Sequence, residues 1–448
     1  MTVQVVGSPA DAGTLVPAEG GPSWLAGRRQ AAADAFNGLP MPSSARDEDW
    51  RRTDVSKLVL GEFEAAPSAV DSSEEFIAML RAFRDGCDPQ AGFVANTRAG
   101  VVAAEQLELL QAQGVTVTSI EDAADRHPES VQRALDALPV EDGKLLSLWL
   151  AKFRGGCFIH VPAGVEAQVP VVICHGTSGD RVSIYPAGLV LVDEHAAATV
   201  IEVYASPRGE TEMLSDAATV LVLGQSARLD YCTAQQWGDG VWHFATQRAL
   251  VGRDARLRFF GATLGARLQK VYWEALLDGE GSDVTINGLA FGGGNRHIDT
   301  QSRQAHRAPH TRSDLLLKVA VRDTARSVYS GMIEVEQRAQ QTDGYVQNRN
   351  LILSQGARAS GVPRLEIKAN DVRCGHGATV GHIDDEQRFY LESRGVATDI
   401  AEQIIVRGFF DDALQHAPHA GFAAMVNGLL DTEVGGRSFA DDPEAAGS

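Results

Sequence analysis

A short motif recurs through the middle of the chain as Ala198-Thr199-Val200, Ala227-Arg228-Leu229, Ala255-Arg256-Leu257 and Ser282-Asp283-Val284. Each copy follows a turn and gives a small residue, a polar residue and the apolar start of a strand. Successive copies begin 29, 28 and 27 residues apart, and later versions stand at Ala325-Arg326-Ser327 and Ala357-Arg358-Ala359. A period near 28 residues, with no helix between the strands, predicts the stacked coils of a β-solenoid.

The strand-rich region begins at Gly155-Gly156 and extends to about residue 373. Its short apolar runs are Val169 to Cys174, Gly188 to Val192, Thr199 to Tyr204, Thr219 to Leu223, Arg228 to Cys232 and His243 to Val251. A sandwich or barrel of hairpins is the alternative, because hairpin turns favour pairs such as Asp239-Gly240, Asp278-Gly279, Asn287-Gly288 and Asp343-Gly344. The regular period favours the solenoid.

The sequence on both sides of the β region is typical of helices. We expect an α-rich N-terminal domain over 21–154, a β-helix core over 155–375 and a helical C-terminal domain over 376–432. The Gly- and Pro-rich leader 1–20 and the acidic tail 433–448 are predicted to be disordered. The predicted fold class is therefore mainly β, with a solenoid flanked by helical domains.

Three short helices are predicted after Gly381. Asp384 can cap the first helix, and Gly395 stands where a left-handed residue ends it. The second begins at Thr398 and carries apolar residues on one side, namely Ile400, Ile404, Ile405 and Phe409. The third covers about His419 to Leu430. Their apolar faces need cover from the solenoid or from a partner protein.

Composition excludes several classes of protein. A net charge of −19 over 448 residues argues against binding to a nucleic-acid backbone or an anionic membrane. No run approaches 18 continuous apolar residues, so no transmembrane helix is expected, and the N-terminus lacks the pattern of a secretory signal. The five cysteines are scattered and odd in number, which predicts reduced thiols in a cytoplasmic protein.

Cys374 and His376 form the clearest candidate site. They are two residues apart in a strand-like run, so their side chains would share one face. A thiolate and an imidazole are ligands for iron, zinc and iron–sulfur clusters, but a tetrahedral metal takes about four ligands. At least two ligands would come from elsewhere. The alternative is a buried cysteine beside a hydrogen-bonded core histidine.

Other cysteine and histidine pairs are interpreted as structural. Cys157 and His160 would face opposite ways on a strand, as would the adjacent Cys174 and His175. His306 and His310 have helical spacing, but Pro309 interrupts any helix there, so both are expected at the solvent or an interface. The sequence has no P-loop and no G-x-S-x-G elbow, and we expect a protein that is not an enzyme.

The C-terminal half resembles the SufB/SufD family of scaffold proteins from the Suf system of iron–sulfur cluster assembly. The matching runs are His297-Ile298-Asp299, His306, Gly331 to Val335, Ala339 to Gly344, Asn350 to Ser354, Pro363 to Ile367, Asp371 to Gly381 and Phe389 to Gly395. A looser likeness continues through the β region to Glu48-Asp49-Trp50-Arg51.

Within this family the chain is more similar to SufD than to SufB. SufD chains carry the Cys-x-His-Gly-Ala-Thr pattern that is seen here from Cys374 to Thr379. SufB chains have acidic residues around the histidine, where this chain has Gly375 and Gly377, and a functional cysteine where this chain has Asn348. The resemblance therefore implies a supporting role beside a SufB-like chain.

The resemblance implies a right-handed parallel β-helix between helical domains. It also implies a complex with one SufB-like chain and two SufC-like ATPase subunits, with a homodimer as a possible state of the isolated chain. His376, and with it Cys374, would lie at the SufB interface as a ligand of iron or of a transient cluster, and no cofactor would be bound permanently. The ATPase would dock on the C-terminal helices, with Phe389, Tyr390, Arg394, Ile404 and Phe409 at the contact.

Two other functions stay open at the level of sequence. A β-solenoid enzyme acting on polysaccharides would need acidic residues aligned along one solenoid face. A SufB-like chain that holds the nascent cluster itself would be expected to carry a cysteine where Asn348 stands.

Overall fold

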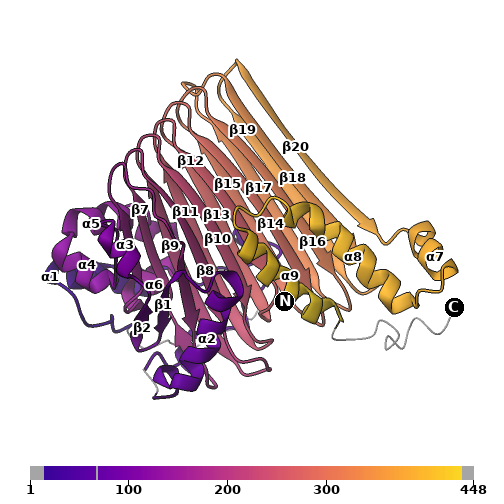
Figure 1. The fold of residues 1–448 in the computed structure, drawn as a ribbon, viewed down its shortest axis with the longest axis horizontal. Coiled ribbons are helices and arrows are strands. Elements are labelled where there is room, and N and C mark those ends of the chain that lie inside the picture. Colours follow the sequence, from indigo (N-terminus) through magenta and orange to yellow (C-terminus); the bar gives the residue numbers. More distant parts are fainter. Residues whose placement is uncertain (1–14, 67–68, 436–448) are drawn as a thin grey trace, which may run out of the picture.

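The computed structural model describes residues 15–66 and 69–435, and its centre is a parallel β-helix of two facing sheets between which the chain alternates (Figure 1). One sheet, sheet B, has the order β2-β1-β5-β8-β10-β12-β14-β16-β18-β20. Its strands are β1 Gly92–Thr97, β2 Gly100–Glu105, β5 Val171–Gly176, β8 Ala197–Ala205, β10 Arg228–Gln236, β12 Arg256–Thr263, β14 Asp283–Gly292, β16 Arg312–Val321, β18 Thr342–Ile352 and β20 Val372–His382.

The facing sheet, sheet A, has the order β19-β17-β15-β13-β11-β9-β7-β4-β3, with β6 paired to β9. Its strands are β3 Thr116–Thr118, β4 Cys157–Val161, β6 Val182–Ile184, β7 Ala187–Val192, β9 Met213–Leu223, β11 Val241–Val251, β13 Leu268–Leu277, β15 His297–His306, β17 Arg326–Val335 and β19 Arg358–Ile367. All the strand pairs from β4 and β5 onward are parallel, so the solenoid prediction is confirmed and the hairpin alternative is wrong.

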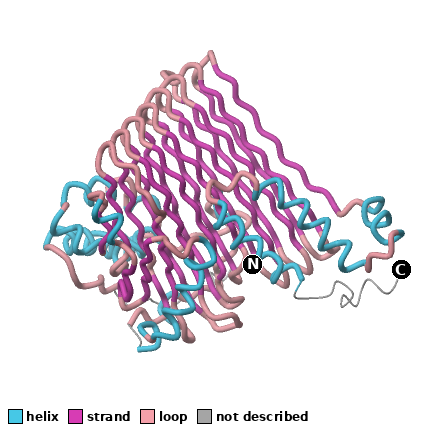
Figure 2. The backbone as a smooth tube through the Cα atoms, in the orientation of Figure 1, coloured by secondary structure: helices cyan, strands magenta, loops and turns pink. Residues whose placement is uncertain are grey.

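Helices lie at both ends of the solenoid and over sheet B (Figure 2). The N-terminal part contains α1 Ser23–Gly38, α2 Glu74–Cys87, α3 Glu108–Ala112, α4 Ile120–Arg126, α5 Pro128–Leu135 and α6 Lys144–Lys152. It also has the short 3₁₀ turns η1 Glu48–Trp50, η2 Leu60–Glu62, η3 Ala69–Ser72 and η4 Val140–Asp142. The C-terminal part contains α7 Asp385–Ser393, α8 Thr398–Leu414 and α9 Ala420–Gly435.

A ladder of turn residues repeats along one edge of the solenoid and sets the period. In each coil, one residue with φ between 53° and 73° donates its backbone N–H to a carbonyl of the next coil; these residues are His195, Ser226, Asp254, Gly281, His310 and Gln341. A small or hydroxyl residue follows each of them and turns inward at the start of a sheet B strand. The repeating motif in the sequence is this turn.

The strand register corrects part of the sequence repeat. Arg228 pairs with Ala197, so the residue equivalent to Ala227 in the preceding coil is Ala196, two positions before the predicted copy. The copies at Ala325 and Ala357 belong to β17 and β19 of sheet A, where Arg326 pairs with Arg358. The repeat read from the sequence therefore combined two kinds of turn, which lie at different corners of the coil.

Aromatic side chains fill the interior where two glycines make room. Tyr231, Phe259 and Trp273 are in contact in series, with ring centroids 5.2 Å and 5.1 Å apart. A Cβ on Gly261 would stand 2.3 Å from Trp273, and one on Gly288 would stand 2.7 Å away. These positions accept no side chain, because protein interiors leave no spare volume for one.

The N-terminal region shares the sheets of the solenoid. The β1–β2 hairpin and β3 extend sheets B and A, although the sequence predicted no strands at 92–105. Helices α1, α4, α5 and α6 pack against the outer face of sheet A through a cluster that includes Trp149 and Phe153. Ser73 caps α2 by accepting a hydrogen bond from the Phe76 N–H.

The C-terminal helices follow the predicted positions. The Asp384 side chain caps α7 by accepting from the Glu386 N–H, and Gly395 ends this helix at φ 83°. Helix α9 extends to Gly435, so the predicted disordered tail beginning at 433 is wrong for its first three residues. Most of the predicted leader, 1–14, and the rest of the tail, 436–448, lie outside the described residues. No helix in the described ranges is long and apolar enough to span a membrane.

Candidate functional site

The solenoid ends in two strands that each have only one neighbour. Strand β20 pairs with β18, and β19 pairs with β17, so each leaves one edge unpaired within residues 15–66 and 69–435. Apolar side chains are partly exposed at this end, with 39% of Ile367 and 49% of Val380 accessible. An open pair of β edges with apolar side chains is a surface for pairing with another chain.

Cys374 and His376 lie on this terminal strand. Cys374 is opposite Gly344 of β18, and His376 is opposite the buried Val346. Because alternate residues of a strand point the same way, both side chains lie on the inner side of β20. Cys374 is half-buried against the solenoid core, whereas His376 is exposed and makes no hydrogen bond or ion pair with a residue in the described part.

The surroundings of Cys374 keep it a neutral thiol. Burial raises the pKa of Cys374, although a hydrogen bond with the Gly344 backbone opposes this. A Cβ on Gly344 would be 3.5 Å from both the Cys374 Sγ and the His306 Nε2, so both atoms border the position that this glycine leaves without a side chain. The thiolate is the form that binds metals, so a partner charge or a metal ion is needed to release the proton.

His306 was expected at the solvent or an interface, and this prediction is wrong. The ring is fully buried, with its Nδ1 2.7 Å from the Thr311 Oγ1 and its Nε2 2.8 Å from the Ser313 Oγ. Burial lowers the pKa of His306 to about 4, so the ring is neutral near pH 7. Pro309 and His310 lie in the following turn, which explains why the sequence pattern looked exposed.

The glycines on either side of His376 are covered by one aromatic ring. Cβ atoms on Gly375 and Gly377 would stand 3.3 Å and 3.4 Å from the Tyr345 side chain, on the outer surface of sheet B. Larger residues at these positions would displace Tyr345, which is 42% exposed. Gly375 and Gly377 therefore add no charge directly beside His376 on that outer face, where the nearest charged residue of β20 is Arg373.

Asn348 lies further along the same inner row as Gly344 and Val346. It is fully buried, donates from its Nδ2 to the Leu317 carbonyl at 3.3 Å, and accepts from Asn350 at 2.6 Å. An amide in this position is a structural group. Of the ligand types expected here, only Cys374 and His376 come together at the open end, and no cluster of three or more metal-ligating side chains occurs within residues 15–66 and 69–435.

The C-terminal helices expose apolar side chains that the chain itself leaves uncovered. Helix α7 has no buried residue, and Phe389 and Tyr390 are 70% and 56% exposed. The Arg394 guanidinium lies 4.9 Å from the centre of the Tyr390 ring. In Figure 1, α7 lies beyond the end of β20, clear of both sheets.

Helix α8 buries a different face from the one that the sequence suggested. Its buried apolar residues are Ala401, Val406, Phe410 and Ala413, whereas Ile400 and Ile404 are 44% and 45% exposed. Phe409 is half-buried against the solenoid, where the Lys318 ammonium lies 5.1 Å from its ring. Four of the five predicted docking residues are thus exposed, and Phe409 is part of the contact with the solenoid.

A buried lysine and an exposed aspartate hold α8 to sheet B. Lys318 is 4% exposed and donates to the Phe409 carbonyl at 2.8 Å and to the Asp412 Oδ2 at 2.6 Å. The Lys318 ammonium lowers the pKa of Asp412 by donating a hydrogen bond to its carboxylate. Asp412 also lies 3.9 Å from Arg349 of β18, so one carboxylate joins α8 to two neighbouring strands.

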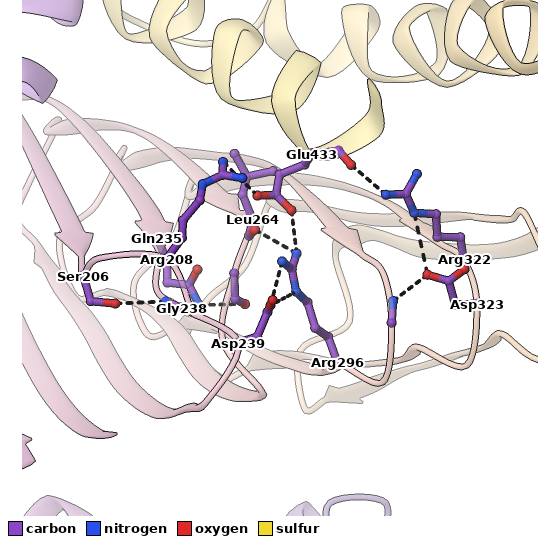
Figure 3. Close-up of polar contacts among 12 residues, drawn as sticks. Ser206, Arg208, Gln235, Gly238, Asp239, Leu264, Arg296, Arg322, Asp323 and Glu433 are labelled. Carbon is purple, nitrogen blue, oxygen red and sulfur yellow. Dashed lines mark hydrogen bonds and ion pairs between the residues drawn. The ribbon is translucent and has the colours of Figure 1, made fainter. Parts of the chain in front are cut away.

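Helix α9 is fixed more firmly, at both of its ends. Its first turn packs on α2 and sheet B, with the Cys87 Sγ 3.3 Å from the Met425 Sδ and Phe422 against Phe260. At its last turn, the Glu433 carboxylate meets Arg296 at 2.8 Å and Arg208 at 3.2 Å (Figure 3).

A third arginine binds the end of the α9 backbone. Arg322 donates to the carbonyls of Glu433 and Val434 at 2.9 Å and 3.1 Å, where the partial negative charge of the helix dipole is concentrated (Figure 3). Arg208, Arg296 and Arg322 come from different turns of the solenoid. The end of α9 therefore ties several coils together.

We expect Glu433→Gln to loosen this end of α9. The substitution removes charge-assisted hydrogen bonds from a site that is 9% exposed, which costs about 1.5–3 kcal/mol of stability. Hydrogen–deuterium exchange should rise in the last two turns of α9, and the urea midpoint should fall. Asp431→Asn is the matched control, because Asp431 stands on the same helix as Glu433 but its pair with Arg407 of α8 is exposed and contributes less than about 1 kcal/mol. Equal effects of the two substitutions would contradict this assignment.

A polar cluster that the sequence did not predict lies inside the solenoid. Glu202 and His175 are both fully buried, with 2.9 Å between the carboxylate and the ring Nε2. Thr219 and Tyr231 also donate to Glu202. His175 and Glu202 are separated by about one solenoid period in the sequence, which is the signal that could have paired them. The predicted divergence of Cys174 and His175 is confirmed, since Cys174 packs on the opposite face of its strand.

Comparison with known proteins identifies two family regions. Residues 174–409 match the model of the SUF system FeS cluster assembly SufBD core domain, and residues 17–173 match the SufBD protein N-terminal region. The chain is 26% identical over 423 residues to the iron–sulfur cluster assembly protein SufB of Bacillus subtilis, covering 93% of this chain and 90% of the relative.

Relatives from staphylococci cover the chain equally well. The SufBD family proteins of Staphylococcus saprophyticus and Staphylococcus aureus are each 25% identical, over 93% of this chain and 90% of the relative. The core-domain match alone spans more than half of the 448 residues. The chain therefore belongs to the SufBD family of iron–sulfur cluster assembly proteins.

Proposed function

We propose that this protein is a SufD-like scaffold subunit that supports iron–sulfur cluster assembly together with a SufB-like chain and a SufC-like ATPase. In this role it performs no catalysis of its own, works in the cytoplasm, and presents ligands for iron or a nascent cluster at a subunit interface. The cluster is cargo that passes through the site. The five free cysteines fit a reducing compartment.

The observation that carries the proposal is the position of His376 at the open end of the solenoid. His376 is exposed, lies on an edge strand, and has Cys374 on the same side two residues earlier. Two soft or borderline ligands are too few for a complete tetrahedral site. A second chain that pairs with the open edges of β19 and β20 would bring the missing ligands, and separation of the chains would expose the cluster.

The C-terminal helices supply a second surface, which suits the ATPase. Phe389, Tyr390, Ile400 and Ile404 are exposed apolar residues on α7 and α8, close to the same end of the molecule. Apolar and aromatic side chains of this kind form the centres of protein interfaces. Movement of α8 would act on β16 and β18 through Lys318 and Asp412, next to the strand that carries His376.

Three residues favour a SufD-like role over a SufB-like one. Asn348 is a buried structural amide. The family resemblance implies a functional cysteine at this position in SufB chains. Gly375 and Gly377 leave the flanks of His376 uncharged, under Tyr345. The similarity to a protein named SufB supports membership of the family. Asn348, Gly375 and Gly377 favour the role of a supporting subunit within that family.

The test is the native mass of the tagged chain, purified without oxygen from its own host. We expect a complex with one SufB-like chain and two ATPase subunits. A monomer or homodimer without ATPase would contradict the proposal. Isolated protein that binds stable iron and sulfide by itself would instead favour the SufB-like function.

His376→Ala then tests the interface site. We expect the complex to assemble normally but to lose most of its capacity to form a cluster, followed by absorbance and by iron and sulfide content. His382→Ala is the matched control, because His382 is also exposed on β20 and lies six residues further on. A cluster yield that falls equally in both variants, or in neither, would remove His376 from the site.

A further inference from the structure

A cavity of about 460 Å³ lies at the opposite end of the molecule from His376. It is bounded by the end of α6, the turn between β1 and β2, and strand β6. Its lining includes three cationic side chains, Arg98, Lys152 and Arg154, and one acidic side chain, Glu19. This is an excess of positive charge in a chain whose net charge is −19.

Two of these cations have no counter-ion among the described residues. Lys152 is half-buried, and neither it nor Arg154 makes a hydrogen bond or ion pair with any residue that the structure describes. Burial, followed by the charge of Arg154, lowers the pKa of Lys152. A half-buried ammonium without a partner is costly, and a bound anion would stabilise it.

Arg98, the third cation, already has partners within the protein and forms part of the cavity wall. Arg98 pairs with the buried Asp71 at 2.8 Å and donates to the carbonyls of Ala66 and Ser178. Its position is therefore fixed before any ligand arrives. Glu19 is exposed and forms no ion pair with another described residue, so it leaves the charge of Lys152 and Arg154 uncompensated.

We propose that this cavity binds a small phosphate-bearing anion, held by the Lys152 ammonium and the Arg154 guanidinium. A guanidinium and an ammonium are the usual protein ligands for phosphate oxygens. The volume is within the range of small-molecule sites and exceeds the needs of a single phosphate group. The site is separate from the scaffold role, so its test does not depend on that proposal.

Calorimetric titration of the wild-type protein with inorganic phosphate and with pyrophosphate tests the site. We expect both to bind, with pyrophosphate the tighter because it offers more charged oxygens to the two cations. Lys152→Gln and Arg154→Gln should each weaken pyrophosphate binding about tenfold or more. Lys57→Gln is the matched control, because Lys57 is exposed and does not line the cavity. This variant should bind pyrophosphate with the affinity of the wild-type protein.

A second measurement keeps the test independent of variant folding. Acylation of lysines in the wild-type protein, mapped by mass spectrometry, should show Lys152 protected by pyrophosphate and Lys57 unprotected. Absence of any binding heat at millimolar pyrophosphate would overturn the proposal. So would affinities that Lys152→Gln leaves unchanged, or labelling of Lys152 that pyrophosphate does not slow.

Discussion

Glu202→Leu is expected to lower the free energy of unfolding by about 3–5 kcal/mol, because it leaves buried donors without their shared acceptor. The Glu202 carboxylate, fully buried, accepts from the Thr219 hydroxyl at 2.9 Å, from the Tyr231 hydroxyl and from the His175 ring. All of these groups lie inside the solenoid, where water cannot replace the lost acceptor. Urea denaturation at pH 7 is the measurement.

Two further variants separate this network from a general effect of removing an acid. Glu166→Leu should change stability by less than about 1 kcal/mol, since its pair with Arg228 is exposed. Tyr231→Phe should cost less in the Glu202→Leu background than in the wild type, because one fewer donor is then left unpaired. Additive effects would show that the two residues do not interact.

The effect of Glu202 should also depend on pH. Burial alone would raise the pKa of Glu202, but hydrogen bonds from His175, Tyr231 and Thr219 outweigh it and lower the pKa below the ordinary 4.5. A carboxyl whose pKa is lower in the folded state stabilises the fold above its unfolded pKa and loses that contribution as the pH falls. The difference between wild type and Glu202→Leu should therefore shrink below about pH 4.5.

The solenoid could be predicted because its turns repeat, whereas the contacts between coils could not. The recurring small residues at 227, 255 and 282 mark one corner of successive coils. Assigning Ala325 to the same series was wrong because the second corner also carries a small residue before an arginine. Pairs such as His175 and Glu202 lie one coil apart, so they become visible only when the register is known.

The candidate site was found from strand alternation, and its surroundings were not. Two positions on one strand must point the same way, which placed Cys374 and His376 together without any structure. The burial of His306 depends on Thr311 and Ser313, which follow the next turn of the chain and make hydrogen bonds with the His306 ring. Helix α8 is apolar on more than one side, so its sequence could not show that Val406 and Phe410 would be buried and Ile404 exposed.

Lys270→Met is expected to destabilise the protein by about 3–5 kcal/mol and to release the turn around η1. The Lys270 ammonium is fully buried and donates to the Asp299 carboxylate and to the Asp49 carbonyl, both at 2.7 Å. It also lies 4.8 Å from the centre of the Trp50 ring. Without it, the Asp299 carboxylate, which is 1% exposed, loses its only ion-pair partner among the described residues.

The structure assigns Lys270 a role in holding the N-terminal turn, which can be measured apart from stability. Thr53 also donates to Asp299, so the carboxylate links residues 49–53 to the outer face of sheet A. Hydrogen exchange at 48–53 should rise in Lys270→Met while α9, at the other sheet, stays protected. Lys368→Met is the matched control, since its pair with Glu366 is exposed.

The double variant Lys270→Met/Asp299→Leu distinguishes a buried charge from lost packing. Removing both charges leaves no unpaired ion in the interior, so this variant should recover much of the stability that Lys270→Met alone loses. Exchange at 48–53 should nevertheless stay high, because the Asp49 carbonyl still lacks its donor and the Thr53 hydroxyl keeps only its contact with the His297 ring. Recovery of both stability and protection would mean that Trp50 packing, rather than the charged pair, fixes the turn.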